Sequence, residues 1–208
     1  MPQDHSLTLL VTDLVGILVF AISGGLAAVQ RSFDIFGVVV LAVITGLGGG
    51  YIRDVSIGAV PPAALSDWRY LVAAIVGGIV VFFFHGAVSR LEISMTLFDA
   101  VGTALFAAAG AIKALDYGLS PLPAAFMGLV TGVGGGIMRD VLSGQVPHVL
   151  RPGQLYAIPA AAGSCVTAFG ANLGMPHVTA EIAGAAVCAG WRLIAIRRNW
   201  QAPIPFAK

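Results

Sequence analysis

Two copies of one short motif combine the residue types best suited to handling charge. Gly48-Gly49-Gly50 is followed by Arg53-Asp54, and Gly134-Gly135-Gly136 is followed at the same spacing by Arg139-Asp140. Carbonyl groups freed at a glycine-rich stretch attract cations, and the arginine and aspartate add fixed charges beside them. The sequence contains no Ser/His/Asp cluster, phosphate loop or dinucleotide fingerprint. We therefore interpret the motifs as parts of a path for a charged solute, and we expect no enzyme.

These motifs belong to an internal repeat with an offset of 86 residues. The stretch from Thr45 to Val55 recurs as the stretch from Thr131 to Val141. The match extends in both directions through the pairs Asp13/Asp99, Gly16/Gly102, Phe20/Phe106, Gly24/Gly110, Gly58/Gly144 and Tyr70/Tyr156. Glycine-interrupted segments at corresponding positions of two repeats indicate a permeation or transport path between the halves.

The composition places these repeats in a lipid bilayer. Charged residues make up 10% of the 208 residues and hydrophobic residues 58%. A soluble domain carries about 25% charged residues, so the surface of a soluble enzyme cannot be covered here. Intrinsic disorder needs low hydrophobicity and high net charge, and both are missing. The net charge of +1 also argues against nucleic-acid binding.

Seven apolar segments are long enough to cross a bilayer, which takes about 20 residues. They run approximately over 7–29, 36–57, 69–88, 95–115, 121–143, 154–174 and 178–196. The connections are too short for a soluble domain, so we expect a single transmembrane domain over 1–208. It consists of repeat 1 at about 7–88, repeat 2 at about 95–174 and an extra helix at about 178–196. Three spans in each repeat predict an all-α membrane protein with two inverted three-helix repeats plus a seventh helix.

Basic residues predict the orientation of these spans. An outside N-terminus puts eight basic residues on the inner side, namely Arg31, Arg90, Arg139, Arg151, Arg192, Arg197, Arg198 and Lys208. The outer side then holds three, namely Arg53, Arg69 and Lys113. The positive-inside rule therefore predicts a multi-pass protein of the cell inner membrane, with the N-terminus outside and the C-terminus cytoplasmic. We interpret the basic tail from Arg192 onward as cytoplasmic anchoring, helped by anionic lipid.

The glycine triplets allow two interpretations that are compatible with each other. Three consecutive glycines weaken a helix, so the segments 36–57 and 121–143 are expected to kink at the triplets and line a path. Thr45 and Thr131, which begin the repeated motif, are further candidates for lining it. Alternatively, glycines spaced four residues apart let neighbouring helices pack closely.

Arg53, Asp54, Arg139 and Asp140 are candidates for gating or for lining the pore, because charges inside a span usually face a cavity or a partner. The alternative is a helix end from which the arginine reaches the headgroups. Adjacent residues on a helix point about 100° apart, so each Arg-Asp pair need not form a direct ion pair.

Four further charged residues are candidate site residues. Asp13 and Asp99 form a second duplicated pair, which acts either as helix N-terminal acids or as an ion-attracting mouth or a partner of Arg53 or Arg139. Lys113 has Ala27 as its counterpart, and it either reaches the headgroups or moves in the membrane field. Asp116, three residues on, is a candidate partner for Lys113.

The remaining chemically active residue types carry no assigned role. Cys165 and Cys188 stand in apolar stretches and are expected to be packing residues. Glu181 lacks a repeat partner and is expected to be structural. The four histidines show no ligand spacing, so no metal site is expected.

At the repeated Gly-Gly-Gly-x-x-Arg-Asp-Val, within a 3+3+1 arrangement of spans, the chain resembles the prokaryotic trimeric intracellular cation (TRIC) channel family. The resemblance covers essentially the whole chain. It implies a homotrimer with one pore per protomer, selective for monovalent cations and chiefly for potassium over sodium. The resemblance further implies that the second and fifth spans line that pore, kinked at the triplets, and that Lys113 occupies the position tied to voltage gating in the family.

The resemblance implies no cofactor. The expected ligands are permeant potassium or sodium ions and bound lipid, and the expected partners are the bilayer and further copies of the chain, not nucleic acid. Related bacterial sequences are also described as glycine transporters. A facilitator of glycine or another small neutral amino acid is therefore the alternative, with duplicated aspartate and arginine recognising ammonium and carboxylate. A purely structural protein is the third class.

Overall fold

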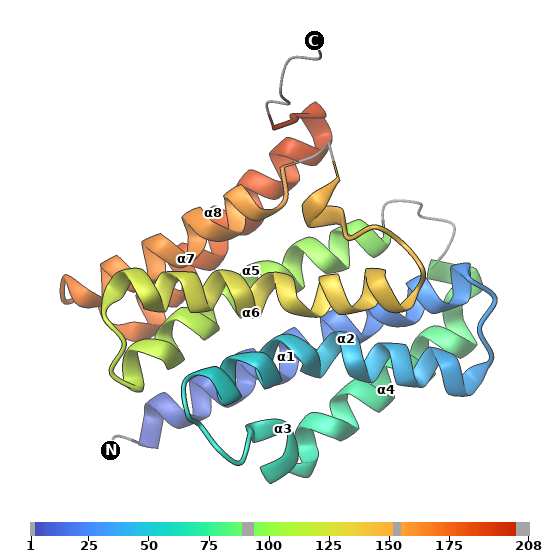
Figure 1. Cartoon of the computed structure of the whole chain (residues 1–208), viewed down its shortest axis with the longest axis horizontal. Coiled ribbons are helices and arrows are strands. Elements are labelled where there is room, and N and C mark those ends of the chain that lie inside the picture. Colours follow the sequence, from blue (N-terminus) through green and yellow to red (C-terminus); the bar gives the residue numbers. More distant parts are fainter. Residues whose placement is uncertain (1–2, 89–93, 152–154, 203–208) are drawn as a thin grey trace.

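The computed structural model of the chain describes residues 3–88, 94–151 and 155–202, and its main elements are helices (Figure 1). They are α1 Gln3–Gln30, α2 Ile35–Ser56, α3 Ala63–Ser66, α4 Trp68–Val88, α5 Ser94–Asp116, α6 Pro121–Leu142, the 3-10 helix η1 His148–Leu150, α7 Ala157–Asn172 and α8 His177–Arg198. The expected all-α membrane architecture is confirmed within these ranges.

Six helices are long and apolar enough to cross a membrane: α1, α2, α4, α5, α6 and α8. The predicted span 154–174 corresponds to α7, which has 16 residues and is shorter than the about 20 residues that a bilayer requires. The seventh span therefore stays a prediction. The sequence did not predict α3 and η1, which follow α2 and α6 at nearly equivalent positions of the two copies.

The helices α2 and α6 end in the same way in both copies. Gly58 and Gly144 adopt left-handed backbone conformations with φ of 77° and 71°, which cost glycine little. Behind each glycine the chain folds back onto the helix. The N–H of Ala59 donates to the carbonyl of Asp54 and that of Gln145 to the carbonyl of Asp140, both at 2.8 Å. The glycine present in both copies thus gives α2 and α6 the same C-terminal structure.

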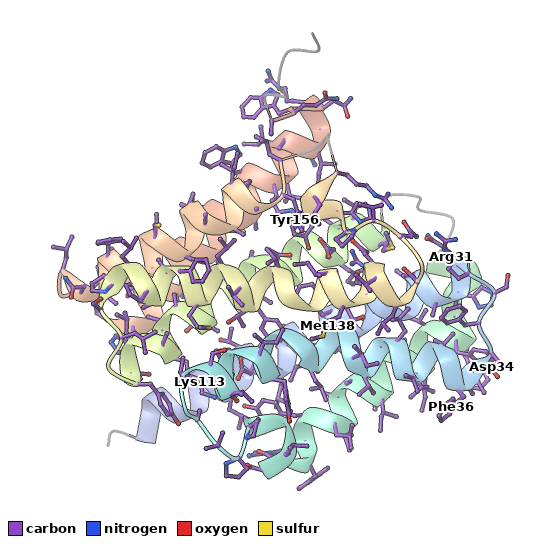
Figure 2. All side chains as sticks on the ribbon, viewed as in Figure 1. Arg31, Asp34, Phe36, Lys113, Met138 and Tyr156 are labelled. Atoms are coloured by element: carbon purple, nitrogen blue, oxygen red, sulfur yellow. The ribbon has the colours of Figure 1, made fainter. Side chains whose placement is uncertain are left out.

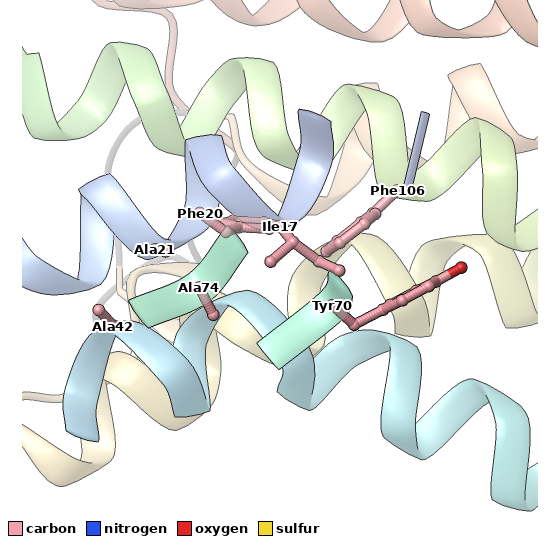
Figure 3. Close-up of a cluster of buried hydrophobic side chains, with 7 residues drawn as sticks. All are labelled: Ile17, Phe20, Ala21, Ala42, Tyr70, Ala74 and Phe106. Atoms are coloured by element: carbon pink, nitrogen blue, oxygen red, sulfur yellow. The ribbon is translucent and has the colours of Figure 1, made fainter. Parts of the chain in front are cut away.

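The helices α1 and α5 meet through equivalent residues of the two copies. The rings of Phe20 and Phe106 lie 5.3 Å apart between centroids, as the close-up in Figure 3 shows. A Cβ on Gly16 would approach the Phe106 ring to 2.6 Å, and a Cβ on Gly102 would approach the Phe20 ring to 2.9 Å. The same small residue in each copy therefore makes room for the same aromatic residue of the other.

The helices α2 and α6 cross in a similarly reciprocal contact. A Cβ on Gly49 would collide with the carbonyl oxygen of Thr131, and a Cβ on Gly135 would collide with that of Thr45. Followed by colour in Figure 1, α2 and α6 run in opposite directions, and so do α1 and α5. Only glycine allows two backbones to approach this closely.

The last helix packs on α7 through another pair of small residues. A Cβ on Gly163 would lie 2.6 Å from the carbonyl oxygen of Gly184, and one on Gly184 would collide with the Thr167 hydroxyl. This contact holds α8 beside α7, and both helices also pack against α5. The arrangement brings the inner face of α8 to the second copy of the repeated motif.

Candidate functional site

The duplicated Arg-Asp motif builds two clusters of buried charges. The first cluster consists of Asp13 on α1, Arg53 and Asp54 on α2, Tyr70 on α4 and Lys113 on α5. The Arg53 guanidinium donates from Nη1 and Nη2 to the two carboxylate oxygens of Asp13, both at 3.2 Å, and from Nε to Asp54 Oδ1 at 2.8 Å. Arg53 is 1% exposed, so it does not extend to the membrane surface.

Asp54 joins three elements in the first cluster. Its Oδ1 atom lies 2.8 Å from the ammonium of Lys113, which reaches across from α5. Its Oδ2 atom accepts the N–H of Ala63 at 3.0 Å, at the start of α3. The Tyr70 hydroxyl donates to Asp13 Oδ2 at 3.3 Å. Every acid of this cluster thus has at least two donors.

The second cluster repeats this plan with Asp99 on α5, Arg139 and Asp140 on α6, Tyr156 beside α7 and Arg192 on α8. Arg139 contacts Asp99 Oδ1 at 2.7 Å and Asp140 Oδ1 at 2.8 Å. The Tyr156 hydroxyl donates to Asp99 Oδ1 at 3.1 Å. In Figure 2, Lys113 of the first cluster and Tyr156 of the second lie well apart.

Two residues complete the second cluster from outside the motif. Ser23 on α1 accepts a hydrogen bond from Arg139 Nη1 at 2.6 Å, which ties the first copy to the second. Asp140 Oδ2 accepts the backbone N–H of His148 at 2.8 Å, and the His148 ring Nδ1 lies at the same distance. Asp140 therefore anchors η1 as Asp54 anchors α3.

Arg192 is the functional candidate that the sequence interpretation assigned wrongly. It was expected in the cytoplasmic anchoring tail, but it is 3% exposed and lies inside the second cluster. Its guanidinium donates to Asp99 Oδ2 at 3.0 Å and to the Thr103 hydroxyl at 3.1 Å. It also stacks on Tyr156, 3.9 Å from the ring centroid. Its place within the span 178–196 was the available signal, since an arginine inside a span usually has an interior partner.

A small cavity of about 10 Å³, enough for about one water molecule, adjoins the first cluster. Asp13, Arg53 and Tyr70 supply its charged and polar wall, while Gly50 and Phe106 supply part of its apolar wall. Gly50 has no side chain to fill this space. A Cβ added at Gly50 would have the Arg53 side chain, 3.8 Å away, as its nearest neighbour outside the local helix backbone. Its size and its polar wall are suited to holding a single water molecule.

A family model described as "Glycine transporter" matches the chain twice, over residues 10–86 and 96–172. A UPF0126 membrane protein of Deinococcus radiodurans is 45% identical over 90% of this chain and 87% of its own length. The UPF0126 inner membrane protein YadS of Escherichia coli K12 is 40% identical over 93% of both chains.

Solved structures give the more specific comparison. A TRIC trimeric intracellular cation channel orthologue from Rhodobacter sphaeroides superposes with a TM-score of 0.88 at 33% identity, over 93% of this chain and 99% of that one. A prokaryotic TRIC channel crystallised in 0.5 M KCl gives a TM-score of 0.86, again at 33% identity, over 93% of this chain and 98% of that one. The chain belongs to the TRIC family. It is a multi-pass membrane protein.

The glycine triplets of this TRIC protein serve mainly in packing. Gly49 and Gly135 form the crossing of α2 and α6, while Gly48 lies against the Met138 sulfur. Two further glycines also have close neighbours: a Cβ on Gly134 would lie 3.3 Å from Gly49 Cα, and a Cβ on Gly136 would lie 2.6 Å from the Tyr156 hydroxyl. Of the two triplets, only Gly50 has open space on a cavity wall.

Both triplets lie within continuous α-helix, so neither helix unwinds there. A bend within the continuous helix stays a prediction. Thr45 and Thr131 are buried, and their hydroxyls donate to the carbonyls of Leu41 at 2.6 Å and Met127 at 2.7 Å, four residues back. These hydroxyls therefore bond to their own helices.

The charged candidates form different partnerships from some of those expected. Each Arg-Asp motif pairs directly, which the 100° offset between neighbours did not require. Asp13 and Asp99 each partner the arginine of their own copy. Asp116 does not pair with Lys113. Its carboxylate instead lies 3.6 Å from the ring of His177, while Lys113 binds Asp54.

Proposed function

We propose that this TRIC protein is a passive channel for monovalent cations, chiefly potassium over sodium. The observation that carries the proposal is the match over almost the whole chain to solved TRIC cation channels, with TM-scores of 0.88 and 0.87. These relatives support a cation channel and a membrane protein without enzymatic activity. Two buried charge clusters beside the α2–α6 crossing are consistent with an ion path.

The proposed path follows α2 and α6, with bends at the glycine triplets. The cavity beside Gly50 supports a route along α2, because it brings open volume to the charged wall of the first cluster. The crossing at Gly49 and Gly135 holds the two helices in backbone contact, which leaves the path closed between the clusters. Opening would then require α2 and α6 to shift along or away from each other.

We further propose seven spans in two inverted three-helix repeats plus α8, with the N-terminus outside and the C-terminus cytoplasmic. The reciprocal contacts of Phe20 with Phe106 support a two-fold relation between the copies, since such a relation makes each residue meet its own equivalent. The opposite directions of α2 and α6 support the inversion. The variants Tyr117→Cys and Arg31→Cys test the orientation when a membrane-impermeant thiol reagent is applied from outside. Only the cysteine at position 117 is expected to react.

A homotrimer with one path in each protomer is part of the proposal. The orthologue from Rhodobacter sphaeroides is described as trimeric. Exposed apolar side chains on the helix surfaces are available for contact with neighbouring copies or lipid, including Val11, Val15 and Ile182. Native mass spectrometry of the purified protein should give a mass of three chains, with or without bound lipid. A monomer at every protein concentration would contradict this assembly.

The description "Glycine transporter" makes a small neutral amino acid the second candidate solute. Such a solute needs one unpaired acid for its ammonium and one unpaired base for its carboxylate. Within the clusters, both arginines are already bonded to both acids of their copy. The described charges therefore favour an ion over a zwitterion, because a zwitterion would have to break two buried ion pairs.

The deciding experiment is planar-bilayer recording of the purified protein in KCl, with replacement by NaCl. Unitary currents and a reversal potential that favours potassium are expected. Counterflow of labelled glycine in liposomes is measured on the same preparation. Saturable glycine exchange without unitary currents would replace the channel with the transporter. If folded, trimeric protein shows neither currents nor glycine exchange, a structural role is favoured.

A further inference from the structure

A second and larger cavity lies between α1, α5 and α8, outside both charge clusters. Its volume is about 200 Å³, and it is lined by Thr12, Leu105, Val178, Glu181, Ile182 and Ala185. No residue of α2 or α6 lines it, so it is separate from the proposed ion path. A space of this size holds several water molecules, but only two of its lining residues offer polar partners. The cavity therefore suits an occupant that is mostly apolar.

Glu181 brings an unsatisfied carboxylate to the wall of this cavity. The residue is 6% exposed, and its Oε1 atom is buried without a hydrogen-bond partner. The Thr12 hydroxyl of α1 is the polar neighbour of this carboxylate across the cavity. Leaving a buried carboxylate oxygen without a donor is costly, so the site is completed by a donor from outside the described residues.

The other acids buried in the described interior all have basic partners. Asp13 pairs with Arg53, Asp54 with Arg53 and Lys113, and the two acids of the second cluster with Arg139. Glu181 pairs with none of the lysines and arginines that the structure describes. An acid inside a membrane span requires a partner, and the missing donor is therefore a cation.

The cavity lies at the depth where hydrocarbon meets the lipid headgroups. Glu181 is four residues from the start of α8, or about 6 Å along the helix, and Thr12 is two residues into the apolar span of α1. Figure 1 shows α1 and α8 beginning on the same side of the molecule. Val11, Val15 and Ile182 are exposed beside the cavity, so lipid reaches it from the side. In the proposed orientation this lipid belongs to the outer leaflet.

We propose that this cavity binds the primary ammonium headgroup of an aminolipid such as phosphatidylethanolamine. A primary ammonium has three N–H donors, of which one reaches Glu181 Oε1 and another the Thr12 hydroxyl oxygen. The apolar part of the lipid packs on Leu105 and Ile182. A trimethylammonium headgroup has no N–H to donate, so the site discriminates against phosphatidylcholine. This site is independent of the ion path and goes beyond the proposed channel function.

The bound lipid has a structural consequence for the last helix. Among the described elements, α8 packs chiefly on α7 and α5 and only slightly on α1. A headgroup held by Glu181 of α8 and Thr12 of α1 joins these two helices. Phosphatidylethanolamine is therefore expected to raise the melting temperature of the protein in detergent more than phosphatidylcholine does.

Native mass spectrometry of the purified protein tests the preference, using phosphatidylethanolamine and phosphatidylcholine with identical acyl chains. The wild-type protein should retain the ethanolamine lipid preferentially. Glu181→Gln keeps the side-chain size but removes the charge, and it should abolish the preference. Ala185→Leu narrows the cavity with the carboxylate intact, and it should also abolish it. Asp67→Asn alters an acid that is already paired with Arg69 at the surface, and it should retain the wild-type preference.

Contact between Glu181 and the lipid amine is tested on the wild-type protein in phosphatidylethanolamine nanodiscs with dicyclohexylcarbodiimide. The reagent condenses a carboxylic acid with a primary amine in contact, forming an amide and releasing dicyclohexylurea. The peptide that contains Glu181 should carry the lipid as this amide. Dodecylamine added to protein in phosphatidylcholine nanodiscs is the arm for a free amine.

Equal retention of the two lipids by the wild-type protein overturns the inference, and so does a preference that survives Glu181→Gln. If that variant does not fold, the wild-type coupling decides. Coupling of dodecylamine without coupling of phosphatidylethanolamine reassigns the site to a free amine and removes the lipid. A carbodiimide adduct on Glu181 without the lipid shows an empty protonated acid, and a crosslink to a neighbouring copy shows that a second chain fills the cavity. Either result overturns the inference.

Discussion

The Lys113 ammonium on α5 lies 2.8 Å from Asp54 on α2, and this ion pair joins the second copy of the repeat to the first. The reverse link runs from Ser23 on α1 to Arg139 on α6. Neither link is duplicated, because the counterpart of Lys113 is Ala27 and that of Ser23 is Ala109. The two copies are thus linked by different chemistry in the two clusters, an ion pair in the first and a hydrogen bond to a hydroxyl in the second.

Lys113→Gln is expected to weaken the dependence of open probability on voltage. The ammonium sits within α5, and one charge crossing the whole membrane field changes energy by about 2.3 kcal/mol per 100 mV. Bilayer recordings at stepped voltages measure the slope, with Lys113→Arg as the charge-preserving control. An identical slope in Lys113→Gln and wild type would show that Lys113 is not the moving charge.

Arg53→Met is expected to destabilise the protein by about 3–5 kcal/mol, since it leaves two carboxylates buried without their shared partner. Adding Asp13→Asn should recover part of this loss, because one uncompensated charge is then removed. Thermal unfolding in detergent measures both variants. The exposed pair of Asp67 and Arg69 provides the control, and Arg69→Met should leave the melting temperature unchanged. Equal effects of Arg53→Met and Arg69→Met would contradict the role of burial.

Gly135→Ala and Gly50→Ala should separate packing from pore lining. The new Cβ at Gly135 collides with the Thr45 carbonyl, and overpacking of this kind costs about 1–3 kcal/mol. At Gly50 the nearest neighbour is 3.8 Å away, so stability should hold while the cavity narrows and unitary conductance falls. Melting temperature and single-channel current are measured on both. A stable Gly135→Ala, or an unchanged current in Gly50→Ala, would disprove the corresponding assignment.

Gly184→Ala should loosen the docking of α8 on α7. Its Cβ collides with the Thr167 hydroxyl, and the last helix carries Arg192 into the second cluster. Gly190→Ala on the same helix meets nothing within 4 Å, so it should be neutral or gain up to about 1 kcal/mol of helix propensity. Thermal unfolding compares the two variants. Equal melting temperatures would show that the α7–α8 contact contributes little to stability.

Much of the architecture was predictable because a bilayer restricts the backbone to a few solutions. Apolar length alone predicted helices close to α1, α2, α4, α5, α6 and α8. The repeat offset pointed to Arg53, Asp54 and their counterparts as charges inside apolar segments, which need partners. The structure buries and pairs all four, while their role in gating or pore lining stays a prediction. The short helices α3 and η1 were missed because three or four residues carry no usable periodicity.

The sequence by itself determined the membrane class, the duplication and the identity of most buried charges, because hydropathy and self-similarity are properties of the chain alone. Only the tertiary structure decided which charges meet. Lys113 pairs with Asp54 instead of Asp116, which is nearer in sequence, and Arg192 pairs with Asp99 instead of lying in a basic tail. Both pairs form because helices distant in sequence bring these groups together across a buried interface. It also decided that most of the triplet glycines pack while Gly50 borders a cavity. Glycines at equivalent positions of the two motifs have different surroundings because the neighbouring helices contribute different side chains.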